Sequence, residues 1–272
     1  MITPKILASA LILSTCGLCL CIASQQSGAR LAIGRMKAKD YFKNPVEARF
    51  VEAVVSGDTK TLSKLIQEGV NVNATGREGM RPLFWAIGQG NVKGFEFLLL
   101  NGADPNIVAP SSSGDGISVS VMGLSAIAAN PAYLRLALRH GGDPNASAGY
   151  GNRTIIFESI MNNRLPNVQL LIEAGANLNH QDISGSPPIQ DAATIGNFDM
   201  VYVLLNSGAN PKLKDRWGYD LAADIEKYGA RVTKGDREQH KWFLKVCTEL
   251  QQRGLLKGAK STGSTRAKDV GS

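Results

Sequence analysis

The sequence predicts a mainly α-helical solenoid of about six helix–turn–helix units, joined by β-hairpin loops and closed by a C-terminal capping helix. The first observation is a segment that starts with glycine and recurs at residues 69–73, 102–106, 141–145, 175–179 and 208–211. The intervals between its glycines are 33, 39, 34 and 33 residues. A nearly fixed period of this length indicates one elongated stack of similar units.

The second observation is the apolar spacing within one period, which is clearest over residues 90–106. Phe95, Leu98 and Leu99 have the i, i+3, i+4 spacing of one helix face. Gly102 follows, and glycine takes the left-handed conformation that ends a helix, where a Cβ would cost about 1 kcal/mol. Pro105 then prevents continuation of the helix. The segment therefore predicts the end of one helix, a turn, a second helix and a stop.

The expected elements follow in order along the chain. A basic linker at 24–44 leads into a repeat domain at 45–253. Pro82 and Pro188 are expected in the first turns of two helices, where the missing N–H of proline has no cost. The 39-residue interval places six extra residues in the flexible segment Ser111–Gly116. The units are expected at 45–75, 76–110, a third unit with this insertion, 150–182, 183–215 and a sixth from Arg216. A charged helix near 236–253 caps the apolar end, and the basic tail at 254–272 is expected to be disordered.

The net charge of +7 is located mainly in the flanks of the chain. Residues 1–23 contribute +1, and residues 30–43 and 253–272 contribute +4 each, which leaves −2 for the repeat body. A protein that follows the phosphates of a nucleic acid would need clustered Lys and Arg on the repeats. We therefore expect no nucleic-acid partner, while a basic flank is compatible with an anionic lipid surface.

Residues 1–23 differ from the rest of the chain. Lys5 precedes an apolar run from Ile6 to Ala23, which indicates an export signal. The run allows three alternatives: a signal peptide cleaved after Ala23, a lipoprotein signal with Cys16 as the lipidation candidate in a segment that resembles a lipobox, or an uncleaved anchor. Basic residues after the run outnumber those before it, and an anchor of this kind would leave the repeats in the cytoplasm.

The sequence contains no motif for catalysis, for a metal ion or for a cofactor. His140, His180 and His240 have no metal-ligand spacing, and the glycines at 149–151 lack the Lys-Ser or Lys-Thr of a phosphate-binding loop. Cys247 is the one cysteine outside the leader, and its helical surroundings predict a buried, inert thiol. We therefore expect a protein that is not an enzyme and takes no cofactor, metal or small-molecule substrate.

Units two and five carry residues that resemble ankyrin repeats. The matching residues of unit two are Gly79, Pro82-Leu83, Ala86, Gly90-Asn91, Leu98-Leu99 and Gly102-Ala103-Asp104. Those of unit five are Gly185, Pro188, Ala192, Gly196-Asn197, Leu204-Leu205 and Gly208-Ala209-Asn210. Phe84, Phe157 and Gln190 stand where the family has a histidine that cross-links neighbouring loops, which leaves those links unaccounted for. The resemblance implies an ankyrin solenoid that binds protein.

The same resemblance places the partner on the hairpin tips and the inner helices, which line a concave surface. Solvent-facing positions are polar by default, yet several of these are apolar or aromatic, and they concentrate in units four to six. The candidate partner-binding residues are Arg77, Met80, Tyr150, Arg153, Met161, Ile183, Ile195, Trp217 and Tyr219. Aromatic and Arg anchors at such sites carry about 2 kcal/mol or more each.

Exported bacterial ankyrin-repeat proteins that resemble this chain include immunity proteins, which neutralise secreted toxins such as type VI lipase effectors in the periplasm. Others support envelope enzymes such as catalase. The resemblance thus implies a periplasmic, membrane-associated protein that binds one protein partner, a secreted toxin or an envelope enzyme. The alternatives are a scaffold for an envelope enzyme and an adaptor anchored in the inner membrane with cytoplasmic repeats.

Overall fold

The structure is a computed structural model that describes residues 37–110, 118–229 and 234–256. The predicted export signal or anchor, the lipidation candidate Cys16 and most of the basic linker lie outside the described residues. So do the insertion Ser111–Gly116 and nearly all of the basic tail. None of the described helices is both long and apolar enough to cross a membrane.

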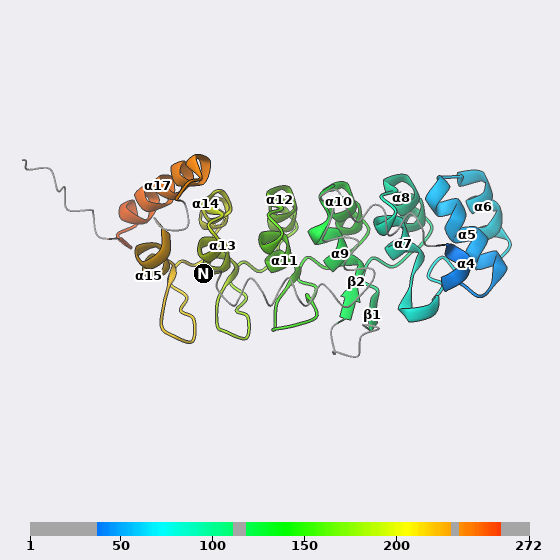
Figure 1. Ribbon diagram of the computed structural model, residues 1–272, viewed down its shortest axis with the longest axis horizontal. Helices are drawn as coiled ribbons and strands as arrows, with labels where there is room; N and C mark the ends of the chain where they lie inside the picture. Colours follow the sequence, from blue (N-terminus) through cyan, green and yellow to red (C-terminus); the bar gives the residue numbers. More distant parts are fainter. Residues whose placement is uncertain (1–36, 111–117, 230–233, 257–272) are drawn as a thin grey trace, which may run out of the picture.

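The described chain is a row of antiparallel helix pairs with hairpin loops along one side (Figure 1). The inner helices, next to the hairpins, are α5 (Pro45–Ser56), α7 (Pro82–Gly88), α9 (Val121–Ile127), α11 (Ile155–Met161), α13 (Pro188–Ile195) and α15 (Leu221–Asp224). The outer helices are α6 (Thr59–Gln67), α8 (Val92–Leu100), α10 (Ala132–Arg139), α12 (Leu165–Glu173) and α14 (Phe198–Asn206). The predicted helical solenoid is confirmed.

Shorter elements complete the array. They are α4 (Ala38–Tyr41), the 3₁₀ turn η1 (Arg77–Gly79), the π-helical turn η2 (Ile225–Gly229) and the terminal helix α17 (Arg237–Gln252). Strands β1 (Val108–Pro110) and β2 (Ser118–Ser120) pair antiparallel, with Ala109 opposite Val119. Outside this pair, the described hairpins show one isolated bridge, between Ser147 and Thr154. The hairpin loops therefore contain little regular strand.

The recurring glycines end the outer helices as the sequence predicts. Gly69, Gly102, Gly141, Gly175 and Gly208 have φ values between 82° and 97°, the left-handed region that glycine adopts at low cost. Each one turns the chain out of an outer helix and toward the next hairpin. The repeat period is therefore a period of backbone geometry as well as of sequence.

The core is a continuous apolar layer between the inner and outer helices. Phe50, Phe95, Phe157 and Phe198 are each fully buried in it. Rings of neighbouring units also meet, since the Phe95 and Tyr133 centroids lie 5.2 Å apart in an edge-to-face arrangement. Full burial of such a side chain contributes about 1.5–3 kcal/mol, so stability is distributed along the array.

Both ends of the described array are covered by aromatic side chains. At the N-terminal end Tyr41 packs against Trp85, whose ring is 5.5 Å away and almost fully buried. At the other end α17 packs on α14, and the rings of Phe243 and Phe198 are 5.1 Å apart. The helix that the sequence places near residues 236–253 thus covers the open apolar end, as terminal repeats require.

Four asparagines in the loops that follow the outer helices join successive units, and we call them the Asn ladder. The Oδ1 atoms of Asn73, Asn106, Asn145 and Asn179 each accept a hydrogen bond of 2.7–3.0 Å from a backbone N–H of the following unit. The amide nitrogen of Asn106 also donates to the Gly141 carbonyl at 2.9 Å. These bonds link the loop that follows one outer helix to the loop that follows the next. Register is therefore fixed between neighbouring units.

Candidate protein-binding surface

The hairpin tips of units four to six form one connected surface, which we call the tip strip and define as residues 149–153, 182–186 and 215–219. The amide of Ile183 donates to the Gly151 carbonyl at 2.8 Å, and the amide of Arg216 donates to the Ser184 carbonyl at 2.9 Å. These hairpins hang side by side below the inner helices (Figure 1). Because the bonds join backbone to backbone, the three tips form one preorganised surface.

Side chains add further links between these hairpins. The amide nitrogen of Gln190 donates to the Tyr219 carbonyl at 2.7 Å, and that of Gln181 donates to the Lys214 carbonyl at 3.0 Å. Gln190 stands where the ankyrin family has its histidine, so in this chain a glutamine supplies the cross-link. Phe84 and Phe157, at the corresponding positions of units two and four, are buried in the core.

Two large apolar side chains of the tip strip face solvent. Ile183 is 74% exposed and Trp217 is 56% exposed. The guanidinium of Arg216 lies over the Trp217 ring, 5.1 Å from its centroid, and donates to the Ile183 carbonyl at 2.8 Å. Exposed tryptophan and arginine held in a defined geometry are typical anchors of protein interfaces. Of the residues predicted from the sequence, Ile183 and Trp217 are the ones most open to a partner within this strip.

Tyr150 is half-buried and engaged within the chain. Its hydroxyl donates a 2.7 Å hydrogen bond to the carboxylate of Glu158 on helix α11. Burial raises the pKa of the Tyr150 hydroxyl, and the nearby charge of Glu158 raises it further. Burial also raises the pKa of Glu158, although the bond from Tyr150 acts in the opposite direction. Tyr150 therefore stays neutral and fixes the hairpin of unit four to its own inner helix.

Arg153 connects units four and five through a largely buried ion-pair cluster. Its guanidinium pairs with Asp182, at 3.4 Å, and with Asp191, and only 15% of its side chain is exposed. The same guanidinium lies over the Phe157 ring, 5.2 Å from the centroid. This arrangement leaves little of Arg153 for a partner and gives it a positioning role in the tip strip.

Asp182 is held ionised by its own turn. Burial favours the neutral form, but hydrogen bonds from Ser184 and Ser186 outweigh this effect and lower the pKa of Asp182. The Asp182 carboxylate accepts from the Ser184 hydroxyl at 2.6 Å and from the Ser186 amide at 3.1 Å. The charge that Arg153 pairs with is therefore built into the hairpin of unit five.

The remaining predicted residues lie on the inner helices, at the end of the last segment of the tip strip, and at the far end of the array. Met161, Ile195 and Tyr219 are half-buried, and Arg77 is exposed on η1. The Lys227 ammonium donates to the Tyr219 hydroxyl at 3.2 Å and lies 4.3 Å from the centroid of the Tyr219 ring. Arg77 belongs to the hairpin of unit two and is not part of the tip strip.

The prediction that Met80 faces a partner is wrong, because its side chain is only 5% exposed and belongs to the core. The Met80 carbonyl accepts a 2.8 Å hydrogen bond from the Gly76 amide and so closes its hairpin. The Ser186 and Tyr219 carbonyls close the hairpins of units five and six in the same way. A side chain at this closing position lies at the base of its hairpin, where Met80 and Ser186 are buried and Tyr219 is half-buried.

Three exposed cations close to Trp217 in the sequence are not among the residues predicted above. Lys212, Lys214 and Arg216 are all exposed, whereas Leu213 and Asp215, which alternate with them, are half-buried. The segment has turns at residues 211–212 and 216–217, so what the three cations share is their exposure and not one strand face. Their closeness along the chain to Trp217 was the signal in the sequence that could have identified them.

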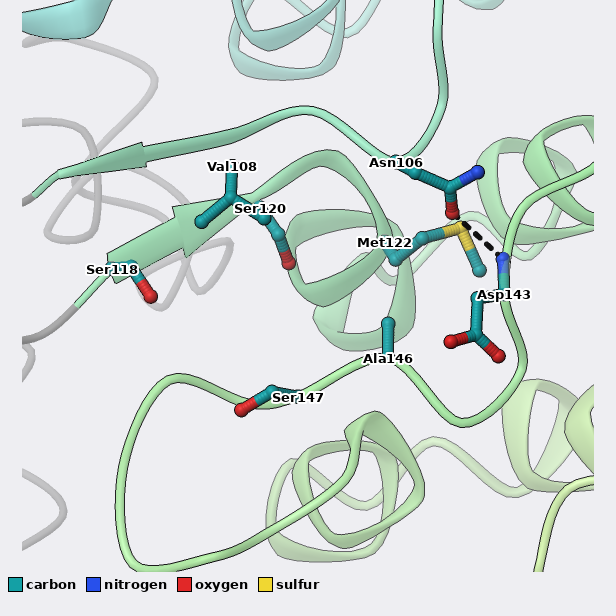
Figure 2. A pocket seen from close by; sticks show the side chains of 8 residues that line it. All are labelled: Asn106, Val108, Ser118, Ser120, Met122, Asp143, Ala146 and Ser147. Atoms are coloured by element: carbon teal, nitrogen blue, oxygen red, sulfur yellow. Dashed lines mark hydrogen bonds between the residues drawn. The ribbon is translucent and has the colours of Figure 1, made fainter.

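An open pocket of about 280 Å³ lies between β2 and the following hairpin (Figure 2). Its lining residues are Asn106, Val108, Ser118, Ser120, Met122, Asp143, Ala146 and Ser147. Several of its polar groups hold the fold together, since the side-chain oxygen of Asn106 accepts from the Asp143 amide at 2.8 Å and the hydroxyl of Ser120 accepts from the Gly123 amide at 2.9 Å. Among the described residues that line the pocket, Asp143 is the one ionisable group, so they offer no pair of acid and base.

Potential metal ligands and nucleophiles give no second site in the described part of the chain. No group of three or more His, Cys, Asp or Glu residues there is placed to hold a metal ion. Cys247 is half-buried, and burial raises the pKa of its thiol, which disfavours the reactive thiolate. The surface with the clearest binding character is thus the tip strip.

Comparison with known proteins agrees with the fold. A family model described as ankyrin repeats (many copies) matches residues 50–99 and 156–205. The crystal structure of an ankyrin repeat domain from Acinetobacter baumannii superposes with a TM-score of 0.58 and 26% identity, over 73% of this chain and 97% of that one.

Curated relatives share the repeats over part of their length. The nuclear factor NF-kappa-B p105 subunit of Gallus gallus is 26% identical over 69% of this chain and 18% of its own length. The phosphocholine transferase AnkX of Legionella pneumophila is 25% identical over 60% of this chain and 17% of its own length. The chain thus spans less than a fifth of these two relatives, and what it shares with them is the repeat array, a protein–protein interaction module. The chain therefore carries ankyrin repeats, which the family model matches over residues 50–99 and 156–205.

Proposed function

We propose that this chain is a non-catalytic, exported and membrane-associated protein that binds one protein partner through the tip strip, and that the partner is a secreted toxin of the lipase type, which it neutralises. The observation that carries the binding site is the pair of exposed apolar side chains, Ile183 and Trp217, on hairpins joined by backbone hydrogen bonds. The apolar run at Ile6–Ala23 supports the proposed export.

The rigidity of the tip strip suits a tight inhibitor. A surface that is already ordered in the free protein loses little conformational freedom when it binds, so more of the contact energy becomes affinity. Arg153 and Tyr150 contribute indirectly, since their buried partners hold the hairpins in place. Neutralising a toxin by binding alone requires no catalytic group in the blocking protein.

The binding test uses the secreted proteins encoded next to this gene, each purified and titrated against the full chain by calorimetry. Alanine at Tyr150, Ile183 and Trp217 together is expected to weaken binding at least about tenfold, because it removes the two exposed anchors, Ile183 and Trp217, and the hydroxyl that fixes the hairpin of Tyr150. Binding that stays within about a factor of three of the unsubstituted chain contradicts this site. The matched control carries alanine at Val46, Leu100 and Leu244, which are exposed apolar residues outside the tip strip.

The proposed location and role have separate tests. Protease added to spheroplasts is expected to digest the repeats of an exported chain and to leave cytoplasmic repeats intact. Cells that secrete the toxin are expected to lose viability when this gene is deleted and to recover with the unsubstituted chain only. Loss of an envelope enzyme activity without any toxin sensitivity would instead favour the scaffold alternative.

A further inference from the structure

We infer that the tip strip recognises an acidic protein segment, in which a carboxylate lies next to an apolar recess that receives Trp217. The inference rests on the proposed function and adds the chemistry of the partner. Its starting point is the row of exposed cations at Lys212, Lys214 and Arg216, on the hairpin that carries the indole. This row contrasts with the mild negative charge of the repeat body as a whole.

The cations of this hairpin are not neutralised by its own acids. Over residues 37–110, 118–229 and 234–256, no ion pair involves Lys212, Lys214 or Arg216. The neighbouring Asp215 carboxylate instead accepts from the backbone amides of Trp217, at 2.9 Å, and Tyr219, at 3.0 Å. The acid of the hairpin therefore shapes the turn, while its cations remain directed to solvent.

The carboxylate of Asp220 is also used within the fold. Its carboxylate accepts from the Ala223 amide at 3.0 Å and so caps helix α15. A carboxylate at the N-terminus of a helix is held by the exposed N–H groups there. The hairpin thus has acids used as structural caps and cations available to a partner.

Arg216 has the geometry for recognising a carboxylate. Its guanidinium is held over the Trp217 ring at 5.1 Å and is fixed at one terminal nitrogen by the Ile183 carbonyl at 2.8 Å. A guanidinium carries five N–H donors, and its planar fork matches a carboxylate in two parallel hydrogen bonds. Because stacking and the carbonyl already orient the group, little rotamer freedom remains to be lost on binding.

The observations favour a protein segment over a membrane surface. Anionic lipids are bound by clusters of about four to eight Lys or Arg residues that act mainly through their charge. The tip strip and its flank carry a shorter row, in which Arg216 is held in a fixed orientation and Ile183 extends the apolar surface beside it. Directional donors next to two exposed apolar side chains suit a carboxylate on a folded or extended polypeptide.

The test is a selection of random twelve-residue peptides, displayed on phage, against the immobilised full chain. The bound peptides are expected to be enriched in Asp or Glu close to an apolar residue. Their affinity is expected to fall at least about tenfold in Trp217→Ala and in the triple variant Lys212→Glu, Lys214→Glu, Arg216→Glu. The control variant has the same change in charge at exposed residues of the outer helices, Lys93→Glu, Arg135→Glu and Arg139→Glu, and is expected to bind as the unsubstituted chain does.

Each other outcome contradicts either the acidic character of the partner or the tip strip as its binding surface. Peptides that need Trp217 but carry no acids, or that bind the triple variant equally well, overturn the acidic partner and leave the tip strip as a binding surface. Peptides insensitive to Trp217→Ala and to the triple variant overturn the tip strip itself. Vesicles with about one-third phosphatidylglycerol are tested in parallel, and a loss of vesicle binding in the triple variant only, without acidic peptides, assigns the cations to lipid.

Discussion

The side-chain amide of Gln190 donates a 2.7 Å hydrogen bond to the backbone carbonyl of Tyr219 and so joins helix α13 to the hairpin of unit six. Gln190 is almost fully buried, so water does not readily replace this bond. A hydrogen bond of this kind contributes about 0.5–1.5 kcal/mol net. The geometry of the last hairpin, with Trp217 at its tip, therefore depends on a residue of the preceding unit.

Gln190→Ala is expected to destabilise the chain by about 1 kcal/mol, because one hydrogen bond between units is lost while the Tyr219 carbonyl keeps its bond from the Asp215 amide. Amide hydrogen exchange over residues 215–219 is expected to accelerate, and a urea titration gives the change in stability. Gln190→His, which restores the residue found in the ankyrin family, serves as the control and should retain most of the protection. Equal exchange rates in the alanine variant and the unsubstituted chain would show that the bond does not hold this hairpin.

Arg153→Met is expected to cost about 3 kcal/mol of unfolding free energy, since it leaves Asp182 and Asp191 buried without their cation. Urea unfolding followed by circular dichroism measures this loss. Arg77→Met provides a matched control on an exposed tip and is expected to change stability by less than about 0.5 kcal/mol. A similar small effect of both substitutions would exclude the positioning role of Arg153.

Glu158→Gln is expected to stabilise the chain at neutral pH and to have little effect near pH 4. Burial raises the pKa of Glu158 in the folded chain above its unfolded value of about 4.3. The contribution of Glu158 to folding stability is therefore fully present below about pH 4.3, and is lost as the pH rises through the folded pKa. Glutamine retains an acceptor for the Tyr150 hydroxyl and does not ionise. Urea midpoints of both proteins at pH 4 and pH 7 test this, and a difference that does not change with pH is the contrary result.

Trp217→Ala is expected to leave stability within about 0.5 kcal/mol of the unsubstituted chain, because more than half of the Trp217 side chain is already exposed. Ile183→Ala should behave in the same way. Thermal unfolding checks both variants, and this result would separate binding anchors from positioning residues such as Arg153. A loss of more than about 2 kcal/mol in either variant would assign that side chain to the packing of the hairpins.

The sequence predicted the features that depend on local geometry. The glycines that end the outer helices, the prolines at the first turns of α7 and α13, and the apolar face of α8 follow from the preferences of single residues or single helices. The repeat period then allowed the helices of one clear unit to be placed in the units with weaker patterns, because equivalent residues recur at nearly constant intervals. The repeat architecture was therefore predictable even where single units matched poorly.

The candidate surface was less predictable, because it depends on contacts between units. Met80 was expected at the surface, but the residue that closes a hairpin lies at its base. The Arg153 cluster needs Asp182 and Asp191, which lie 29 and 38 residues further along the chain. The link from Gln190 could not be read from the family pattern, which expects a histidine there. Exposure of Ile183 and Trp217, in contrast, followed from their places at the hairpin tips.

The Asn ladder has a mechanical consequence for how the array meets a partner. Its hydrogen bonds follow one line along the stack, at the side where the outer helices end, and each bond joins only adjacent units. Bending that stretches this line breaks several polar bonds at once, whereas bending about the line as an axis leaves them intact. We therefore expect the ladder to resist bending that stretches it, and to transmit a pull at one end through each successive unit to the other.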